Sequence, residues 1–153
     1  MGKRVLVELE RHSISKEPIF YGIELASRIR SSVVLIAVSS PESSRKPSLS
    51  EARSGVTEKG VESWMDGAVA ESQKRGVNLE IFFAFGQFYE EVIRFVRSQP
   101  AVQFIVTAVP KKKERNDGNK VASALKHLHE EFEGEILLVQ KAGEITKVSE
   151  LYA

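Results

Sequence analysis

Residues 102–128, VQFIVTAVPKKKERNDGNKVASALKHL, decide the fold of this chain. The stretch predicts a buried strand at 102–109, a stop at Pro110, a hydrophilic loop at 111–120 and a helix beginning near Val121. A strand that runs into a helix in this way brings backbone N–H groups and the positive end of a helix dipole to the carboxyl edge of a sheet, where phosphates commonly bind. Such a turn usually needs glycines, and this loop has Gly118 alone. The stretch therefore holds a ligand site or marks the loss of one.

Apolar, β-branched runs elsewhere in the chain predict the remaining strands, at residues 3–9, 32–39, 77–85 and 136–140. Helical periodicity and helix-start signals predict helices at residues 15–30, 56–75, 88–97 and 121–133. Strands and helices thus alternate along the chain, and crossovers of helical length require parallel, right-handed connections. We expect a flavodoxin-like or Rossmann-like α/β fold, a doubly wound sheet of five parallel strands with four helices.

The composition of this 153-residue chain fits one soluble globular domain, which we expect to comprise residues 1–142, followed by a C-terminal tail at 143–153. The net charge of +1 gives no electrostatic reason to expect nucleic acid as a partner. No apolar run approaches the roughly 18 residues of a membrane span, and the N-terminal run is too short for a signal peptide. We therefore expect a cytoplasmic protein without direct membrane insertion.

Residue types that carry catalysis or metal binding are sparse. The absence of cysteine excludes disulfides and thiolate chemistry and fits a reducing compartment. His127 and His129 are two residues apart, which places them on different sides of a helix, so we expect no metal site. The only aspartates, Asp66 and Asp117, do not follow a predicted strand. The chain also lacks the Gly-x-Ser-x-Gly and His-Glu-x-x-His motifs, so we expect no catalytic residues and no enzymatic activity.

The loop after the fourth strand has two readings. Its basic residues could hold a polyphosphate by charge, but acidic residues of the same loop and the nearby Glu8 and Glu10 offset them. A solvated loop is the favoured interpretation, because charged runs are common in exposed connections. The basic residues concerned are Lys111, Lys112, Lys113 and Arg115.

Three segments carry a resemblance to a known family. They are FGQFYEEVIRFV at 85–96, VQFIVTAV at 102–109 and EILLVQ at 135–140. With the order of strands and helices, they resemble the Gly-hinged helix, the nucleotide-loop strand and the closing strand of the universal stress protein family. The resemblance covers residues 3–141 in architecture. It implies an adenine nucleotide alpha hydrolase-like fold and a role in stress adaptation.

Nucleotide-binding members of this family have the loop motif Gly-x2-Gly-x9-Gly-Ser/Thr after the fourth strand. Placing Ala108 on the first glycine puts Lys111 on the second, and the third falls near Val121 and Ala122. Glu10 takes the position of the family's aspartate at the end of the first strand. Because a side chain at Lys111 blocks close approach of phosphate to the backbone, the resemblance implies a member that does not bind ATP by the usual glycine loop and uses no cofactor.

The alternative is a diverged ATP-binding member, with weak ATP hydrolysis and with Mg²⁺ as the accompanying ion. Its nucleotide would lie at the carboxyl ends of the first and fourth strands. The residues concerned would be Glu10, Thr107, Ala108, Lys111, Val121 and Ala122.

The last predicted strand forms an unbroken apolar run near the chain end, and an edge strand of this kind must be covered. The resemblance implies that the last strands of two protomers meet in a homodimer through Ile136, Leu137, Leu138 and Val139. In the alternative, the tail folds back over its own edge. The expected function is that of a homodimeric regulatory protein of stress adaptation, with an unidentified protein partner such as a transporter or a kinase.

Overall fold

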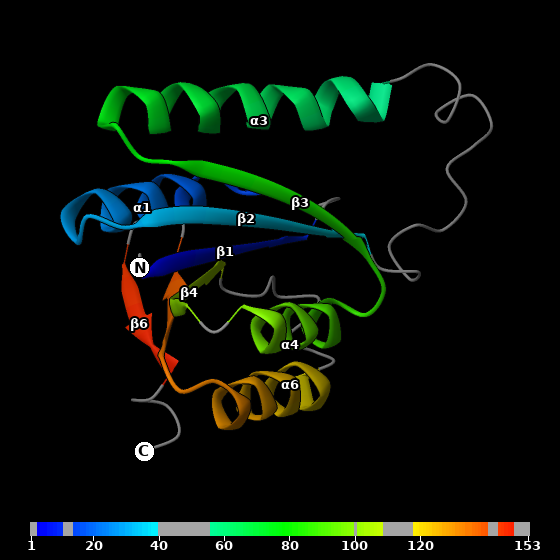
Figure 1. Ribbon diagram of the computed structural model, residues 1–153. Helices are drawn as coiled ribbons and strands as arrows, with labels where there is room; N and C mark the ends of the chain where they lie inside the picture. Colours follow the sequence, from blue (N-terminus) through cyan, green and yellow to red (C-terminus); the bar gives the residue numbers. More distant parts are fainter. Residues whose placement is uncertain are drawn as a thin grey trace.

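The computed structural model describes residues 3–10, 14–39, 56–99, 101–108, 118–140 and 144–148, without the side chains of 56–62 and 118–124. Its strands are β1 (Arg4–Glu10), β2 (Ser32–Ser39), β3 (Leu79–Phe85), β4 (Val102–Ala108), β5 (Glu135–Val139) and β6 (Ile145–Lys147). Its helices are α1 (Lys16–Arg28), α3 (Val56–Arg75), α4 (Phe88–Ser98) and α6 (Gly118–Glu131). Together they form a three-layer α/β domain (Figure 1).

The strands form one sheet in the order β3-β2-β1-β4-β5-β6. The first five of these strands in that order are parallel, and β6 pairs antiparallel with β5. The predicted doubly wound α/β fold is therefore confirmed, and its 3-2-1-4-5 order is that of Rossmann-type sheets rather than the 2-1-3-4-5 order of flavodoxin. The sixth strand was not predicted from the sequence.

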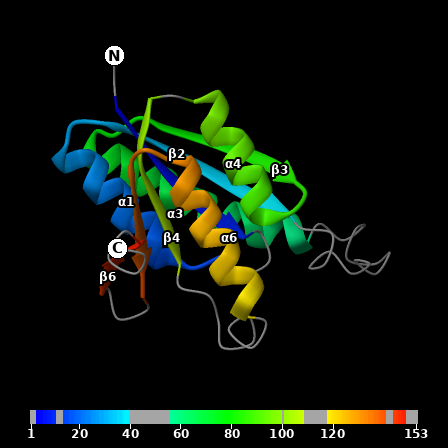
Figure 2. The ribbon, with the colours of Figure 1, turned by 90° about the horizontal axis from the view of Figure 1, so that it is seen from below.

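Helices cover both faces of the sheet. Helices α1 and α3 lie on one face, whereas α4 and α6 lie side by side on the other (Figures 1 and 2). Side chains alternate along each strand, so each central strand contributes to two cores. On β1, Val5 and Val7 pack toward α1, whereas Leu6 packs with residues of α4 and α6. This alternation fixes the direction in which each polar residue of β1 points.

Helix α1 lies unusually close to the sheet. A Cβ atom added at Gly22, in the middle of this helix, would overlap the side chain of Val7 on β1. Glycine is therefore needed here because it lets the helix approach the strand closely, and not for its backbone freedom. The predicted N-cap, Ser15, is the residue before the helix, but its side chain makes no capping hydrogen bond.

Most predicted boundaries hold to within two residues, and those of β2 and α3 coincide with the prediction. The largest difference is at α6, which begins at Gly118 rather than near Val121. The first turn of a helix has no intrahelical partners for its N–H groups, so a glycine there is tolerated better than in the interior. Loop residues 109–117, including the basic run, lie outside the described residues.

The sheet has one covered and one open edge within the described residues. Strand β6 pairs with β5 through Thr146 opposite Leu138, and Val148 just beyond it is fully buried. This is the alternative in which the tail covers the last strand, so β5 is not an edge strand. The homodimer remains a prediction, but pairing of two β5 strands would require β6 to leave. On the other side of the sheet, β3 forms the edge.

Candidate functional site

The strand order places a switch point between β1 and β4. The chain leaves β1 for β2 through α1 on one face, whereas it leaves β4 for β5 through α6 on the opposite face. In open α/β sheets, ligands bind at the carboxyl ends of the two strands where the connections diverge in this way. The ends of β1 and β4 are therefore the candidate functional site.

A buried acid lies at this switch point. Glu8 is two residues before the end of β1, and its side chain is only 2% exposed. It shares the strand face of Leu6 and therefore points toward the layer of α4 and α6. Among the described residues, neither carboxyl oxygen of Glu8 has a hydrogen-bond partner. A buried carboxyl without a partner is costly in a folded protein, so its presence here needs a cause beyond packing.

Thr107 on β4 is a buried polar neighbour of this carboxyl. The register that pairs Val7 with Val106 places Glu8 beside Thr107, whose side chain is also buried at 3% exposure. The Thr107 hydroxyl favours the ionised carboxylate slightly, although the two side chains do not meet in hydrogen-bond geometry. The two residues form a buried polar pair that bridges the central strands.

Burial changes the chemistry of Glu8. Desolvation raises the pKa of Glu8 from its ordinary value of 4.5 to about 8, and the Thr107 hydroxyl opposes this increase only in part. The carboxyl is therefore mainly protonated, and so uncharged, at neutral pH. A neutral acid at a ligand-binding edge does not repel an anion, but it supplies no positive charge either.

The residues predicted for a nucleotide site are only partly brought together. Glu10 ends β1 and is partly exposed, and Ala108 ends the neighbouring β4 and is also partly exposed. Thr107 precedes Ala108 and is buried. Lys111 lies outside the described residues, and so do the side chains of two residues of α6, Val121 and Ala122.

Glu8 is the site residue that the sequence interpretation missed. In the sequence, Glu8 is interpreted, with Glu10, only as an acid that offsets the charge of the basic loop, but the Glu8 side chain is buried. The available signal was its position between Val7 and Leu9, inside a strand that is buried on both faces. An acid at such a position is unusual enough to mark a candidate site.

The four residues predicted to form a dimer interface, Ile136, Leu137, Leu138 and Val139, are all buried within the chain itself. Among the described residues, no group of three or more His, Asp or Glu side chains could hold a metal ion. Within the same part of the chain, no helix has the length and hydropathy needed to cross a bilayer.

Comparison with known proteins identifies the fold. No family model matches the sequence, and no curated protein matches it. The structure is similar to universal stress protein UspA from Lactobacillus plantarum, at a TM-score of 0.60 and 14% identity, covering 90% of this chain and 97% of the other. It is also similar to a universal stress protein from Archaeoglobus fulgidus in complex with dAMP, at a TM-score of 0.55 and 14% identity, covering 88% and 95%.

A third similar structure is an Arabidopsis thaliana protein of this family with AMP bound, at a TM-score of 0.56 and 16% identity, covering 90% of this chain and 91% of the other. The resemblance seen in the sequence is thereby supported across nearly the whole length of the chain. The chain has the fold of the universal stress proteins.

Proposed function

We propose that this chain is a regulatory protein of the universal stress protein type, which acts in stress adaptation through protein contacts rather than by turning over a nucleotide. The observation that carries the proposal is the buried Glu8 carboxyl at the switch point of the sheet. A transporter or a kinase in the cytoplasm is the kind of partner that we expect.

The chemistry of the switch point argues against tight binding of a triphosphate. Such a ligand carries several negative charges and needs basic side chains or close backbone N–H groups. The residues described there offer a buried acid, Glu8, and an uncharged hydroxyl, Thr107. The loop positions that should bring the backbone close to phosphate have side chains, with lysine at Lys111. Lysine supplies charge, but its side chain blocks the approach that glycine allows.

The same residues give no basis for hydrolysis. General acid–base catalysis needs a side chain within reach of both the reacting group and solvent protons. Glu8 is too deeply buried for this role, and hydrolysis of ATP also needs Mg²⁺ held by oxygen ligands. We therefore propose a protein without enzymatic activity and without a resident cofactor.

A second candidate function is binding of a mononucleotide. It is favoured by the similar structures from Archaeoglobus fulgidus and Arabidopsis thaliana, which contain dAMP and AMP. A monophosphate needs less positive charge than a triphosphate. In this candidate, Glu10 and Ala108 at the ends of β1 and β4 would lie beside the nucleoside, whereas Glu8 would stay buried below the site.

Calorimetric titration of the full chain at neutral pH, with ATP and Mg²⁺ and separately with AMP, distinguishes these functions. The first proposal expects no binding of ATP up to millimolar concentration. Micromolar binding of ATP with Mg²⁺ would contradict it and would favour the diverged nucleotide-binding alternative. Binding of AMP but not of ATP would support the second candidate. Changes in the NMR chemical shifts of backbone amides near Thr107 on adding AMP would then locate the ligand.

A further inference from the structure

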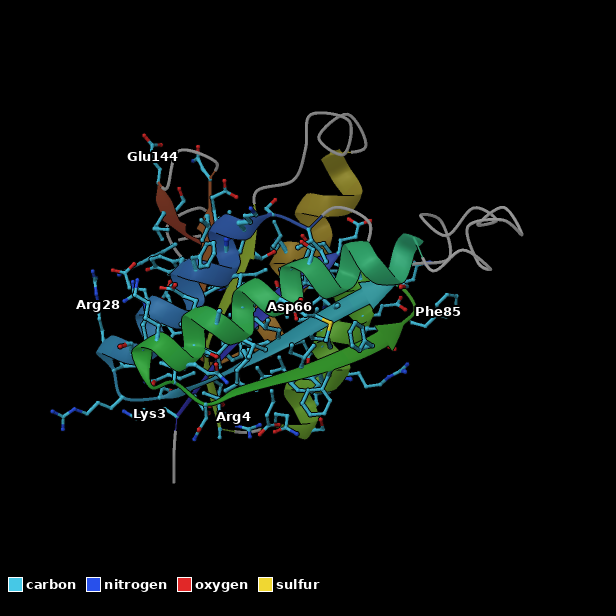
Figure 3. All side chains as sticks on the ribbon, turned by 90° about the horizontal axis from the view of Figure 1, so that it is seen from above. Lys3, Arg4, Arg28, Asp66, Phe85 and Glu144 are labelled. Atoms are coloured by element: carbon cyan, nitrogen blue, oxygen red, sulfur yellow. The ribbon has the colours of Figure 1, made fainter. Side chains whose placement is uncertain are left out.

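The open edge of the sheet presents an exposed aromatic surface. Three phenylalanines of β3 are exposed, Phe82 at 40%, Phe83 at 50% and Phe85 at 66%. Phe82 points to the face of α4, where its ring lies 5.3 Å from that of Phe95, whereas Phe83 and Phe85 point to the opposite face. Figure 3 shows Phe85 projecting from the end of β3, far from Glu144 beside β6 on the other side of the sheet.

Within the described residues, β3 lacks several features that usually protect an edge strand. Natural edges are blunted by lysine, proline, a β-bulge or a very short strand. Strand β3, LEIFFAF, has seven residues without lysine or proline, and its pairing with β2 runs without a register shift. Its single charged residue, Glu80, is neutralised by an ion pair with Arg4 at 2.6 Å. The edge therefore has the character of an interface rather than of a solvated border.

The direction of the backbone groups can be read from the ends of the strand. The Asn78 carbonyl accepts a hydrogen bond from the Val33 N–H, and the Gly86 N–H donates to the Ser39 carbonyl. Asn78 and Gly86, which flank β3, thus direct their backbone groups toward β2, and both have even numbers. Because the backbone groups of successive strand residues point to alternate sides, the even-numbered residues of β3 direct theirs toward β2. The odd-numbered residues, which include Leu79, Ile81 and Phe85, direct theirs outward. No strand of the described part of the chain lies on that side.

We infer that a second copy of this chain pairs with the first along β3, antiparallel and about a two-fold axis at Phe82. A two-fold axis perpendicular to the sheet keeps each helix layer on its own face, so residues directly opposite each other must point to the same face. Centring the axis on Phe82 places Leu79 of each strand opposite Phe85 of the other. This register uses the whole length of the outward-facing edge.

In this register, the residues that face each other across the two copies are compatible in charge and in size. Glu80 meets Ala84 of the second copy instead of another glutamate, so no like charges face each other. Phe82 meets its own counterpart on the face of α4, and the exposed Phe85 ring covers the partly buried Leu79 on the other face. Because the contact is self-complementary, it closes with two copies and does not continue into a fibre.

The exposed ring surface is large enough to matter. With about 200 Å² for a phenylalanine side chain, the three exposed fractions amount to roughly 300 Å². A stable interface buries roughly 800 Å² on each partner, and the strand backbone with the flanking parts of α3 and α4 would supply the rest. Since β6 already covers β5, β3 is the edge at which such a dimer forms without rearrangement.

Sedimentation velocity of the full chain over a concentration series tests the dimer, with Phe85→Lys as the variant and Phe20→Lys as the matched control. Phe20 is 40% exposed on α1 and lies away from this edge. We expect a reversible wild-type dimer, a dissociation constant at least about tenfold higher for Phe85→Lys, and no change for Phe20→Lys. A wild-type chain that stays monomeric, or a dimer that Phe85→Lys leaves unchanged, would overturn the inference.

A cross-linking experiment tests the register and remains informative if Phe85→Lys fails to fold. The chain has no cysteine, so Phe82→Cys introduces a single thiol at the proposed axis. Opposed residues of a non-hydrogen-bonded antiparallel pair lie within disulfide distance. We expect Phe82→Cys to form a disulfide-linked dimer under mild oxidation and Lys147→Cys, on β6, to remain monomeric. Preferential cross-linking of Lys147→Cys would place the contact at the opposite edge and overturn the inference.

Discussion

Glu8 on β1 and Thr107 on β4 lie next to each other across the two central strands, and both side chains are buried on the face of the sheet that carries α4 and α6. They are the polar residues of an otherwise apolar layer, at the point where ligands bind in folds of this class. The pair therefore links the stability of the sheet to the protonation of one carboxyl.

The first prediction concerns pH dependence. Between pH 4.5, where free glutamate ionises, and about pH 8, where folded Glu8 does, the unfolded chain loses a proton that the folded chain keeps. The free energy of unfolding should therefore fall as pH rises through this range, by up to about 1.4 kcal/mol per pH unit. Glu8→Gln should flatten this slope and should be at least as stable as wild type near pH 8, as measured by urea unfolding.

Glu90→Gln is the matched control, because Glu90 is an exposed glutamate of α4. It should leave the slope of the wild-type protein in place. An equally steep slope in Glu8→Gln would show that the buried carboxyl is not the source of the pH dependence.

The second prediction concerns Thr107. The hydroxyl of Thr107 lowers the pKa of Glu8, so the nearly isosteric Thr107→Val should raise that pKa further. Carbon-detected NMR titration of the Glu8 carboxyl measures the change directly. Ser39→Ala, at another buried polar residue near a strand end, is the control and should leave the titration of Glu8 unchanged. A lower pKa in Thr107→Val would contradict this description of the pair.

The third prediction compares two helical glycines. Replacing a glycine by alanine inside a helix usually stabilises by about 1 kcal/mol. Gly67→Ala in α3 should do so, since, apart from the adjacent backbone of its own helix, no described atom lies within 4 Å of its added Cβ. Gly22→Ala in α1 should instead destabilise by roughly 1–3 kcal/mol, because the methyl group overlaps Val7. Chemical denaturation measures both, and Val7→Ala should recover part of the loss in Gly22→Ala.

The fourth prediction concerns the covered edge. Removing residues 143–153 deletes β6 and the buried Val148, and it opens the outer edge of β5. The truncated chain should unfold at lower urea concentration and should associate through β5, because an uncovered apolar strand pairs readily. Light scattering after size-exclusion chromatography measures the association. If the truncated chain matches the full chain in stability and mass, β6 does not protect this edge.

The fold could be predicted because its signals are local. The apolar run SVVLIAVS at Ser32–Ser39 predicts a strand, and the helical spacing of apolar residues in Phe88–Ser98 predicts a helix, both without long-range information. The order of alternation then fixes the parallel connections. Strand β6 was missed because three residues, Ile145–Lys147, carry no clear periodicity, and their pairing depends on β5 being nearby.

The site was less predictable for a physical reason. An acid near the end of a strand looks the same in sequence whether it reaches solvent or lies beneath a helix. Glu8 is buried and Glu10 is partly exposed although both lie near the carboxyl end of β1, and this difference depends on the packed layers rather than on the local sequence. The exposed phenylalanines of β3 were likewise consistent with an edge strand, but their exposure required the sheet order.

We propose that side chains at the loop positions of the missing glycines exclude ATP from this chain. Equilibrium dialysis with labelled ATP and Mg²⁺, on wild type and on the double variant Ala108→Gly/Lys111→Gly, tests it most directly. We predict no binding by wild type up to millimolar ATP and measurable binding by the variant, because the backbone can then approach the phosphates. Micromolar binding by wild type, equal to that of the variant, would contradict the claim.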